Sequence, residues 1–309
     1  MGEYHRSLVG AIDWGGSKIE VGLFDAAGEM VRRERQPSGF GAATTSLLSA
    51  AERLDRMART VGHDLASLAG IGIAVPGMVD RSRGVLVFAP DHAVRDLDVR
   101  RLLQEHLGME LRVEIDNDVR AAARAEARLP ASAGKDMLWL TVSSGVGGAL
   151  VLGGAVREGA NGLAGEIGHI TVDPGGEQCG CGKRGCLQTV CAAPALVREA
   201  HRRGLAVTTA AEVASLCGAG DERAVRVLER ATHHLAGVLA AVVTIVDVEV
   251  VTIGGGVGLG LDPSALQERI RRDVLERDQR RLIVQHTTLG PAASLVGAAG
   301  LVTIHEEAP

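Results

Sequence analysis

Three cysteines within eight residues are the most distinctive chemical feature of this sequence. Cys179, Cys181 and Cys186 follow a C-x-C-x4-C pattern, whereas Cys191 and Cys217 lie apart from it. The N-terminal stretch shows no basic segment followed by an apolar one, so no secretory signal is expected. In such a chain, clustered cysteines favour a metal site over disulfides. Cys191 and Cys217 are expected to be small buried side chains.

Two glycine-rich turns and a glycine triplet offer backbone amides to a phosphate. A polyphosphate needs such amides with a nearby hydroxyl and lysine, and a carboxylate can hold water on Mg²⁺. Neither turn fits the P-loop or the Rossmann glycine pattern, and either alone is equally a tight hairpin turn. Their recurrence favours phosphate binding, with Asp13 on Mg²⁺. The candidates are Asp13, Gly15, Gly16, Ser17 and Lys18 in the first turn, Ser144, Gly145 and Gly147 in the second (Ser143 to Gly148), and Gly254, Gly255 and Gly256.

Asp116, Asn117 and Asp118 stand between an expected strand and an alanine-rich helix. One carboxylate near a substrate hydroxyl is enough to accept its proton during phosphoryl transfer. The same residue types also cap helix N-termini. The residues alone favour the cap over the base, and both remain open at this point.

Composition excludes several classes of protein. The 309 residues are 46% hydrophobic and 23% charged, which is typical of a soluble globular chain and not of a disordered one. A net charge of −5 and only 2% aromatic residues argue against nucleic-acid binding. No apolar run is long enough to span a bilayer. We therefore expect a cytoplasmic protein with no nucleic-acid or membrane partner.

The order of elements predicts an α/β fold with an internal repeat. Strands are expected at residues 8–12 and 19–24 around the first turn, and again at 137–142 and 149–152 around the second. Helices and further strands follow each hairpin. A repeat of this kind suggests two related α/β domains facing a cleft. The expected division is residues 1–116 joined by the terminal helix at 293–309, and residues 117–292.

The sequence resembles the ROK family (repressor, ORF, kinase) of sugar kinases. The strongest block is residues 159–188, GANGLAGEIGHITVDPGGEQCGCGKRGCLQ. The family pattern there is GxxGxAGEIGH followed by CxCGxxGCLE, and the resemblance covers nearly the whole chain. It implies the actin-like ATPase fold, two ribonuclease-H-like domains around a cleft. It also implies an ATP-dependent kinase that phosphorylates a hexose, at O6.

The resemblance also assigns roles to the candidate residues. His169 with Cys179, Cys181 and Cys186 makes a closed Cys₃His set, suited to structural Zn²⁺ and not to catalysis. The family stretch ENDAN maps its catalytic base onto Asp118. Relatives of this kind are commonly dimers or tetramers, so a homodimer or homotetramer is expected. ATP lies over the glycine turns, and the sugar contacts map onto Gly77, Asn117, Asp118, Glu166, His169 and Gln188.

Four departures from the family pattern bear on the acceptor. Gln188 replaces the glutamate of GCLE, Arg120 replaces an asparagine, and Trp14 replaces a small aliphatic residue. The stretch 90–95 reads PDHAVR where glucose-type members read PNLPGW. An amino sugar or a cyclitol therefore remains an alternative acceptor, including N-acetylmannosamine, N-acetylglucosamine and 3-amino-3-deoxyglucose.

Three other functions compete with a kinase. The family includes DNA-binding repressors with a helix-turn-helix domain before the first turn, but only twelve residues precede Asp13 here. A sugar sensor without catalysis is disfavoured because Asp13, Lys18 and Asp118 are all retained. A zinc hydrolase is disfavoured because the ligand set leaves no position for water.

Overall fold

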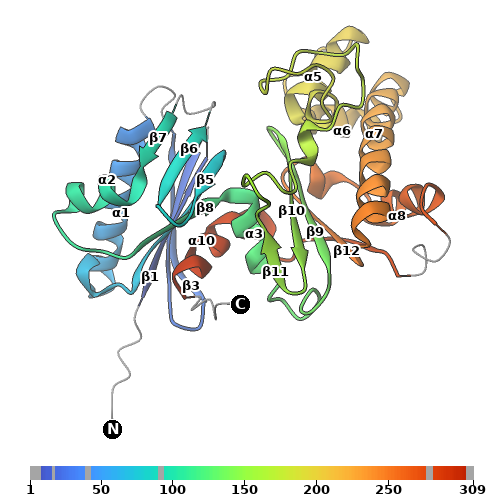
Figure 1. Cartoon of the computed structure of the whole chain (residues 1–309). Coiled ribbons are helices and arrows are strands. Elements are labelled where there is room, and N and C mark those ends of the chain that lie inside the picture. Colours follow the sequence, from blue (N-terminus) through green and yellow to red (C-terminus); the bar gives the residue numbers. More distant parts are fainter. Residues whose placement is uncertain (1–7, 16–17, 39–42, 90–93, 276–280, 304–309) are drawn as a thin grey trace. The chain divides into compact units, whose positions relative to one another are not determined.

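The computed structural model describes residues 8–15, 18–38, 43–89, 94–275 and 281–303 (Figure 1). Gly16 and Ser17 of the first turn, and residues 90–93, lie outside the described residues. The chain divides into two compact units. The first contains residues 1–125 and 292–309, and the second contains residues 126–291. No described helix is long and apolar enough to cross a membrane.

The first unit is built on a five-stranded sheet in the order β3-β2-β1-β4-β8. The first three strands are antiparallel neighbours, whereas β4 pairs in parallel with both β1 and β8. Parallel strands end at the same edge of a sheet, so β1, β4 and β8 bring three chain segments together there. The bounds are β1 Val9–Trp14, β2 Lys18–Phe24, β3 Met30–Pro37, β4 Gly70–Val75 and β8 Val113–Asn117.

Two pairs of helices cover the two faces of this sheet. Side chains of β1 alternate between two apolar clusters, as expected of a strand with both faces buried. Ile12 and Trp14 join the cluster that contains Leu54 of α1, whereas Val9 and Ala11 join the cluster that contains α10 residues. The helices of this unit are α1 Ala43–Thr60, α2 Val99–Leu107, α3 Asp118–Glu126 and α10 Ala293–Thr303.

Glycines let helix α10 approach both the sheet and helix α3 closely. A Cβ at Gly72 would lie 1.8 Å from the carbonyl oxygen of Ala298. A Cβ at Gly297 would lie 2.1 Å from the carbonyl oxygen of Ala121. Since α3 packs on α10 through small residues, the first unit extends to residue 125. The sequence placed this boundary at 116.

Strands β5, β6 and β7 form a separate antiparallel sheet in the first unit. They lie at Met78–Asp80, Val85–Ala89 and Val94–Asp98, and a 3₁₀ turn at Leu65–Ser67 precedes β4. Neither this sheet nor strand β3 was predicted from the sequence.

The second unit repeats the same sheet, in the order β11-β10-β9-β12-β13. Again the first three strands are antiparallel, and β12 pairs in parallel with β9 and β13. The internal repeat and the α/β class predicted from the sequence are therefore confirmed. The strands are β9 Met137–Val142, β10 Val146–Leu152, β11 Ala155–Arg157, β12 Val250–Gly254 and β13 Ile283–His286.

The apolar run near the end of the chain's longest helix is buried, as expected. Helix α7 contributes ten buried residues, from Ala224 to Val243, to the core of the second unit. Thr209, Asp221 and Asp262 cap α6, α7 and α8 by accepting hydrogen bonds from backbone amides. The helices are α4 Gln188–Cys191, α5 Ala193–Arg202, α6 Ala210–Gly218, α7 Glu222–Val246 and α8 Pro263–Arg272, with 3₁₀ turns at Ile167–His169, Gly258–Gly260 and Gly290–Ala292.

Candidate active site and metal centre

The ends of three parallel strands assemble the polar residues of the first unit. Asp13 lies near the end of β1, Gly77 follows β4, and Asp118 follows β8 directly. Asp13 pairs with Ala74 across the sheet, and Ala74 pairs with Asp116. The fold therefore gathers at one sheet edge residues that are more than 100 positions apart in the sequence.

Asp13 and Asp118 are close enough to influence each other electrostatically. Burial is the largest cause that raises the pKa of Asp13, to about 7. The negative charges of Asp118 and Glu20 raise it further, whereas Lys18 and Arg33 oppose the shift. A carboxyl group in this state gains from a nearby cation, because the cation favours its charged form. Asp13 is therefore suited to Mg²⁺.

Glu20 neutralises part of the positive charge beside the first turn. It is the register partner of Asp13, and its side chain is fully buried. Lys18 Nζ donates to Glu20 at 2.7 Å, Arg35 Nη2 lies 2.6 Å from it, and Arg33 is also paired with it. Burial raises the pKa of Glu20, but the bonds from Lys18 and Arg33 outweigh it and lower the pKa. In this structure Lys18, a predicted phosphate contact, is bound to Glu20. Sequence reasoning missed Glu20, Arg33 and Arg35.

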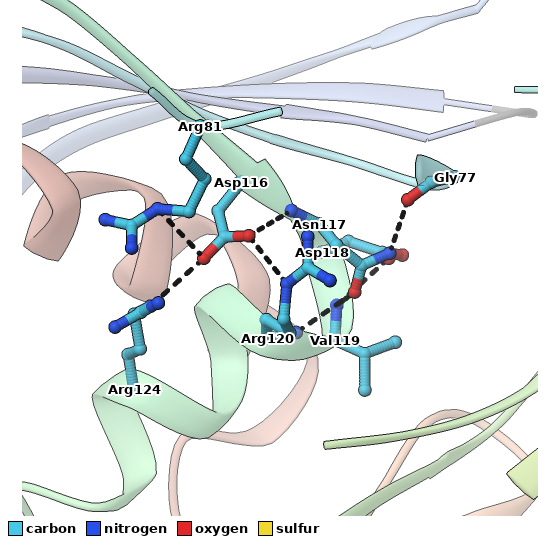
Figure 2. Close-up of polar contacts among 8 residues, drawn as sticks. All are labelled: Gly77, Arg81, Asp116, Asn117, Asp118, Val119, Arg120 and Arg124. Carbon is cyan, nitrogen blue, oxygen red and sulfur yellow. Dashed lines mark hydrogen bonds and ion pairs between the residues drawn. The ribbon is translucent and has the colours of Figure 1, made fainter. Parts of the chain in front are cut away.

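Asp116 is a fully buried carboxylate among three guanidinium groups (Figure 2). Its Oδ1 accepts from Arg120 Nε at 2.8 Å, and its Oδ2 accepts from Arg124 Nε at 3.0 Å. Arg81 Nε lies 3.5 Å from Oδ2. Buried charges need such partners. The departure at position 120 therefore has a structural role: this arginine, in the first turn of α3, pairs with Asp116 near the end of β8.

Asn117 and Asp118 make different hydrogen bonds at the start of helix α3. Asn117 Oδ1 accepts from the amides of Val119 and Arg120 at 3.0 and 3.1 Å, which is the interaction of an N-cap. Its Nδ2 donates to the carbonyl of Gly77 at 3.1 Å and ties the ends of β4 and β8 together (Figure 2). Asp118 is half-buried, and its Oδ1 accepts from the amide of Val119 at 2.9 Å.

The glycine triplet of the second unit packs against the end of β9. Gly255 has a φ of +83°, and a Cβ there would lie 2.4 Å from the carbonyl oxygen of Val142. The turn after β9 is shorter than predicted, because β10 begins at Val146. Ser144 and Gly145 lie in the turn, whereas Gly147 lies inside β10 opposite Thr141. Gly254 ends β12, and Gly256 follows it in the loop.

A small apolar hollow of about 20 Å³ lies beside this glycine loop. Val142, Val257 and Leu261 line it next to the glycines, and Cys191 lines it from α4. Burial raises the pKa of the Cys191 thiol to about 12, so this cysteine is a neutral, unreactive group.

The predicted metal ligands converge in the second unit. Four potential ligand atoms lie within 4.8 Å of one another, one each from His169, Cys179, Cys181 and Cys186. The Sγ of Cys179 lies 3.6 Å from His169 Nδ1, and the two sulfurs of Cys181 and Cys186 are also 3.6 Å apart. Tetrahedral Zn²⁺ with its usual bond lengths separates ligand atoms by about 3.5 to 3.8 Å. The donor set and these distances fit Zn²⁺.

Two candidate sugar contacts lie around these ligands. Nε2 of His169, the ring nitrogen not paired with Cys179, lies 3.9 Å from Oε2 of Glu166. Burial, and next the charge of Lys183, lowers the pKa of His169, which keeps the imidazole neutral as a metal ligand requires. Gln188 Nε2 donates to Cys179 Sγ at 3.2 Å.

Comparison with known proteins shows the class of protein to which this fold belongs. The ROK family model matches residues 9–304. A glucokinase of Halalkalibacterium halodurans is 33% identical over 96% of this chain and 94% of its own. An N-acetylmannosamine kinase of Escherichia coli O1:K1 is 33% identical over 84% and 86%. The structure of a ROK family glucokinase from Streptomyces griseus, in complex with glucose and AMPPNP, is similar with a TM-score of 0.80, 28% identity and coverage of 96% and 99%.

The chain belongs to the ROK family. It is a carbohydrate kinase that uses ATP, and the resemblance and fold class predicted from the sequence are confirmed.

Proposed function

We propose that this kinase transfers the γ-phosphoryl group of MgATP to O6 of a hexose, with Asp118 as general base. One observation carries the proposal: Asp13 and Asp118 stand at the carboxyl ends of β1 and β8 in one unit, close enough that the charge of Asp118 raises the pKa of Asp13. A carboxylate for the metal and a carboxylate for the proton are what phosphoryl transfer to a hydroxyl requires.

The reaction then uses these residues in defined roles. The hexose oxygen attacks the γ-phosphorus, the bond from that phosphorus to the bridging oxygen of ADP breaks, and the hydroxyl proton passes to Asp118. Asp13 would hold Mg²⁺ through a water molecule, and the ion would neutralise charge on the phosphates. The proposed nucleotide contacts are Gly15, Gly16, Ser17, Lys18, Ser144, Gly145, Gly147, Gly254, Gly255 and Gly256.

The sugar is held by a separate group of residues in this proposal. Asn117, Glu166 and His169 bond its hydroxyls, together with Gln188 and the backbone at Gly77. Asn117 has two amide hydrogens, and one already goes to the carbonyl of Gly77. His169 has Nδ1 beside Cys179 and Nε2 near Glu166, so it can serve the metal and the sugar at once.

Zn²⁺ is proposed as a structural cofactor held by His169, Cys179, Cys181 and Cys186. The metal supplies a rigid crosslink, since four protein ligands complete its tetrahedron. This crosslink would fix the segment that carries Glu166 and His169, so that both residues lie next to the sugar.

A second acceptor class is supported by a specific observation. The N-acetylmannosamine kinase is as identical to this chain, at 33%, as the glucokinase is, although over 84% of the chain and not 96%. An amino sugar is therefore the alternative acceptor. An assembly of two or four copies stays a prediction that light scattering on the purified protein can test.

The test is ADP release with MgATP against a panel of glucose, mannose, fructose, allose, N-acetylmannosamine, N-acetylglucosamine, 3-amino-3-deoxyglucose and a cyclitol. We expect one strong acceptor, and NMR of the product should show the phosphate on O6. A hexose would support the main proposal, and an N-acetylated sugar the alternative. ADP release no higher with any sugar than without would contradict both.

A further inference from the structure

Gln188 contacts the proposed metal cluster directly. It is the first residue of α4 and lies two positions after Cys186. Its side-chain Nε2 donates to the Sγ of Cys179 at 3.2 Å, and Cys179 is itself buried. The bond thus joins the start of α4 to a cysteine nine residues earlier, on the other side of the cysteine turn.

The residue type at this position matters for that bond. An amide has two N–H donors, whereas an ionised carboxylate only accepts. A glutamate, the residue of the GCLE pattern, could not donate to a thiolate and would place a second negative charge beside it. Three thiolates and a neutral imidazole around Zn²⁺ leave a net charge of −1. An N–H donor stabilises that excess charge, and a carboxylate opposes it.

We propose that Gln188 is a positioning residue of the metal site, whose amide holds the Cys179 thiolate in place and ties α4 to the cysteine turn. This inference rests on the proposed Zn²⁺ site. It explains the departure at position 188 through the metal and does not require a changed sugar. Outer residues that bond metal ligands commonly change metal affinity by about 10- to 100-fold when replaced.

The neighbouring Gln178 provides a matched control. It is exposed, it directly precedes Cys179, and its Nε2 donates to the carbonyl oxygen of Gly182 at 3.1 Å. Gln178→Glu therefore makes the same chemical change beside the same cysteine without removing a donor to a sulfur. Any general effect of added negative charge near the cluster appears in both variants.

The experiment measures Zn²⁺ affinity of the full-length chain by competition with a chromogenic chelator. We expect Gln188→Glu to weaken binding about 10- to 100-fold and Gln188→Leu, which adds no charge, to weaken it less. Gln178→Glu should stay within about threefold of the parent protein, as expected for an exposed charge. Circular dichroism of the zinc-loaded proteins verifies that all variants are folded.

Substituting Co²⁺ for Zn²⁺ provides an absorption band that reports on the bond from Gln188 to the Cys179 sulfur. This band should not change if Gln188 only supports the fold. In the Co²⁺-loaded protein, loss of the donor makes the Cys179 thiolate more electron-rich. The thiolate-to-cobalt absorption band should therefore move to lower energy in Gln188→Leu and not in Gln178→Glu.

The results separate the inference from the site on which it rests. Parent-like Zn²⁺ affinity and an unshifted cobalt band in both Gln188 variants would overturn it, even if the KM for sugar rises. A parent protein that binds no stoichiometric Zn²⁺ would overturn both the metal site and this inference.

Discussion

Asp116, Asn117 and Asp118 are adjacent in the sequence but have different partners in the structure. Asp116 bonds buried guanidinium groups, Asn117 caps α3, and Asp118 is half-buried near Asp13. From the residues alone the stretch was better explained as a helix cap, and the family resemblance favoured Asp118 as the base. The pairing of Asp116 with Arg81 was not predictable, because Arg81 lies outside the helix and strand that the sequence indicated.

Replacing Asp13 should make the protein more stable at alkaline pH. The folded pKa of about 7 lies above the unfolded value of 3.8, so the folded state holds the proton more tightly. The stability that this group contributes falls as pH rises from about 4 through 7. Asp13→Asn removes that dependence and should raise the unfolding free energy at pH 8 by about 1 to 3 kcal/mol. Urea titrations without Mg²⁺ at pH 5 and pH 8 measure it, and an equal effect at both pH values would contradict the account.

Removing the carboxylate of Asp116 should be strongly destabilising. Breaking a buried ion pair typically costs about 3 to 5 kcal/mol, so Asp116→Ala should lower the unfolding free energy by that amount. Asp55→Ala is the control, because Asp55 pairs with the exposed Arg59 and such pairs contribute about 0 to 1 kcal/mol. Denaturant unfolding of both variants gives the comparison. Similar losses of unfolding free energy in the two variants would show that the buried Asp116 ion pairs stabilise the protein no more than an exposed pair does.

At the scale of elements, apolar strands and long helices could be predicted from the sequence, whereas polar strands could not. Buried strands such as β1 and β9 and the apolar end of α7 were predicted. Strand β3 reads MVRRERQP, and its side chains are mostly exposed or ion-paired, so hydrophobic alternation could not indicate it. Gly148 was assigned to the phosphate turn but lies in β10, where a Cβ would come within 2.8 Å of the carbonyl oxygen of Gly165.

The close approach of α10 to the sheet predicts unequal effects of two glycine substitutions. Gly72→Ala would place Cβ against the Ala298 carbonyl and should cost about 3 kcal/mol by displacing the helix. Gly237 lies in α7, and no atom lies within 4 Å of a Cβ added there. Gly237→Ala should therefore raise the unfolding free energy by about 0.5 to 1 kcal/mol. Thermal unfolding of both variants tests this. A neutral Gly72→Ala would mean that α10 packs less closely.

At the scale of the molecule, a repeated sheet carries different chemistry in its two copies. By strand register, Asp13 in β1 corresponds to Thr141 in β9. Asp116 in β8 corresponds to Thr287, which follows β13 and donates its amide to the carbonyl of Ile253. Only the first of these copies has carboxylates at the two positions. The second copy instead carries the cysteine cluster. The sequence predicted the repeat from its glycine turns, but the correspondence of individual positions depends on strand register.

The most direct test of the proposed mechanism is the turnover of Asp118→Asn with its best acceptor. Loss of a general base should lower kcat about 10²- to 10⁴-fold, while ATP affinity and melting temperature stay near those of the parent. Asp55→Asn, the same change at an exposed ion pair, should retain full activity. A folded Asp118→Asn protein with kcat within a few-fold of the parent would contradict the assignment of Asp118 as the base.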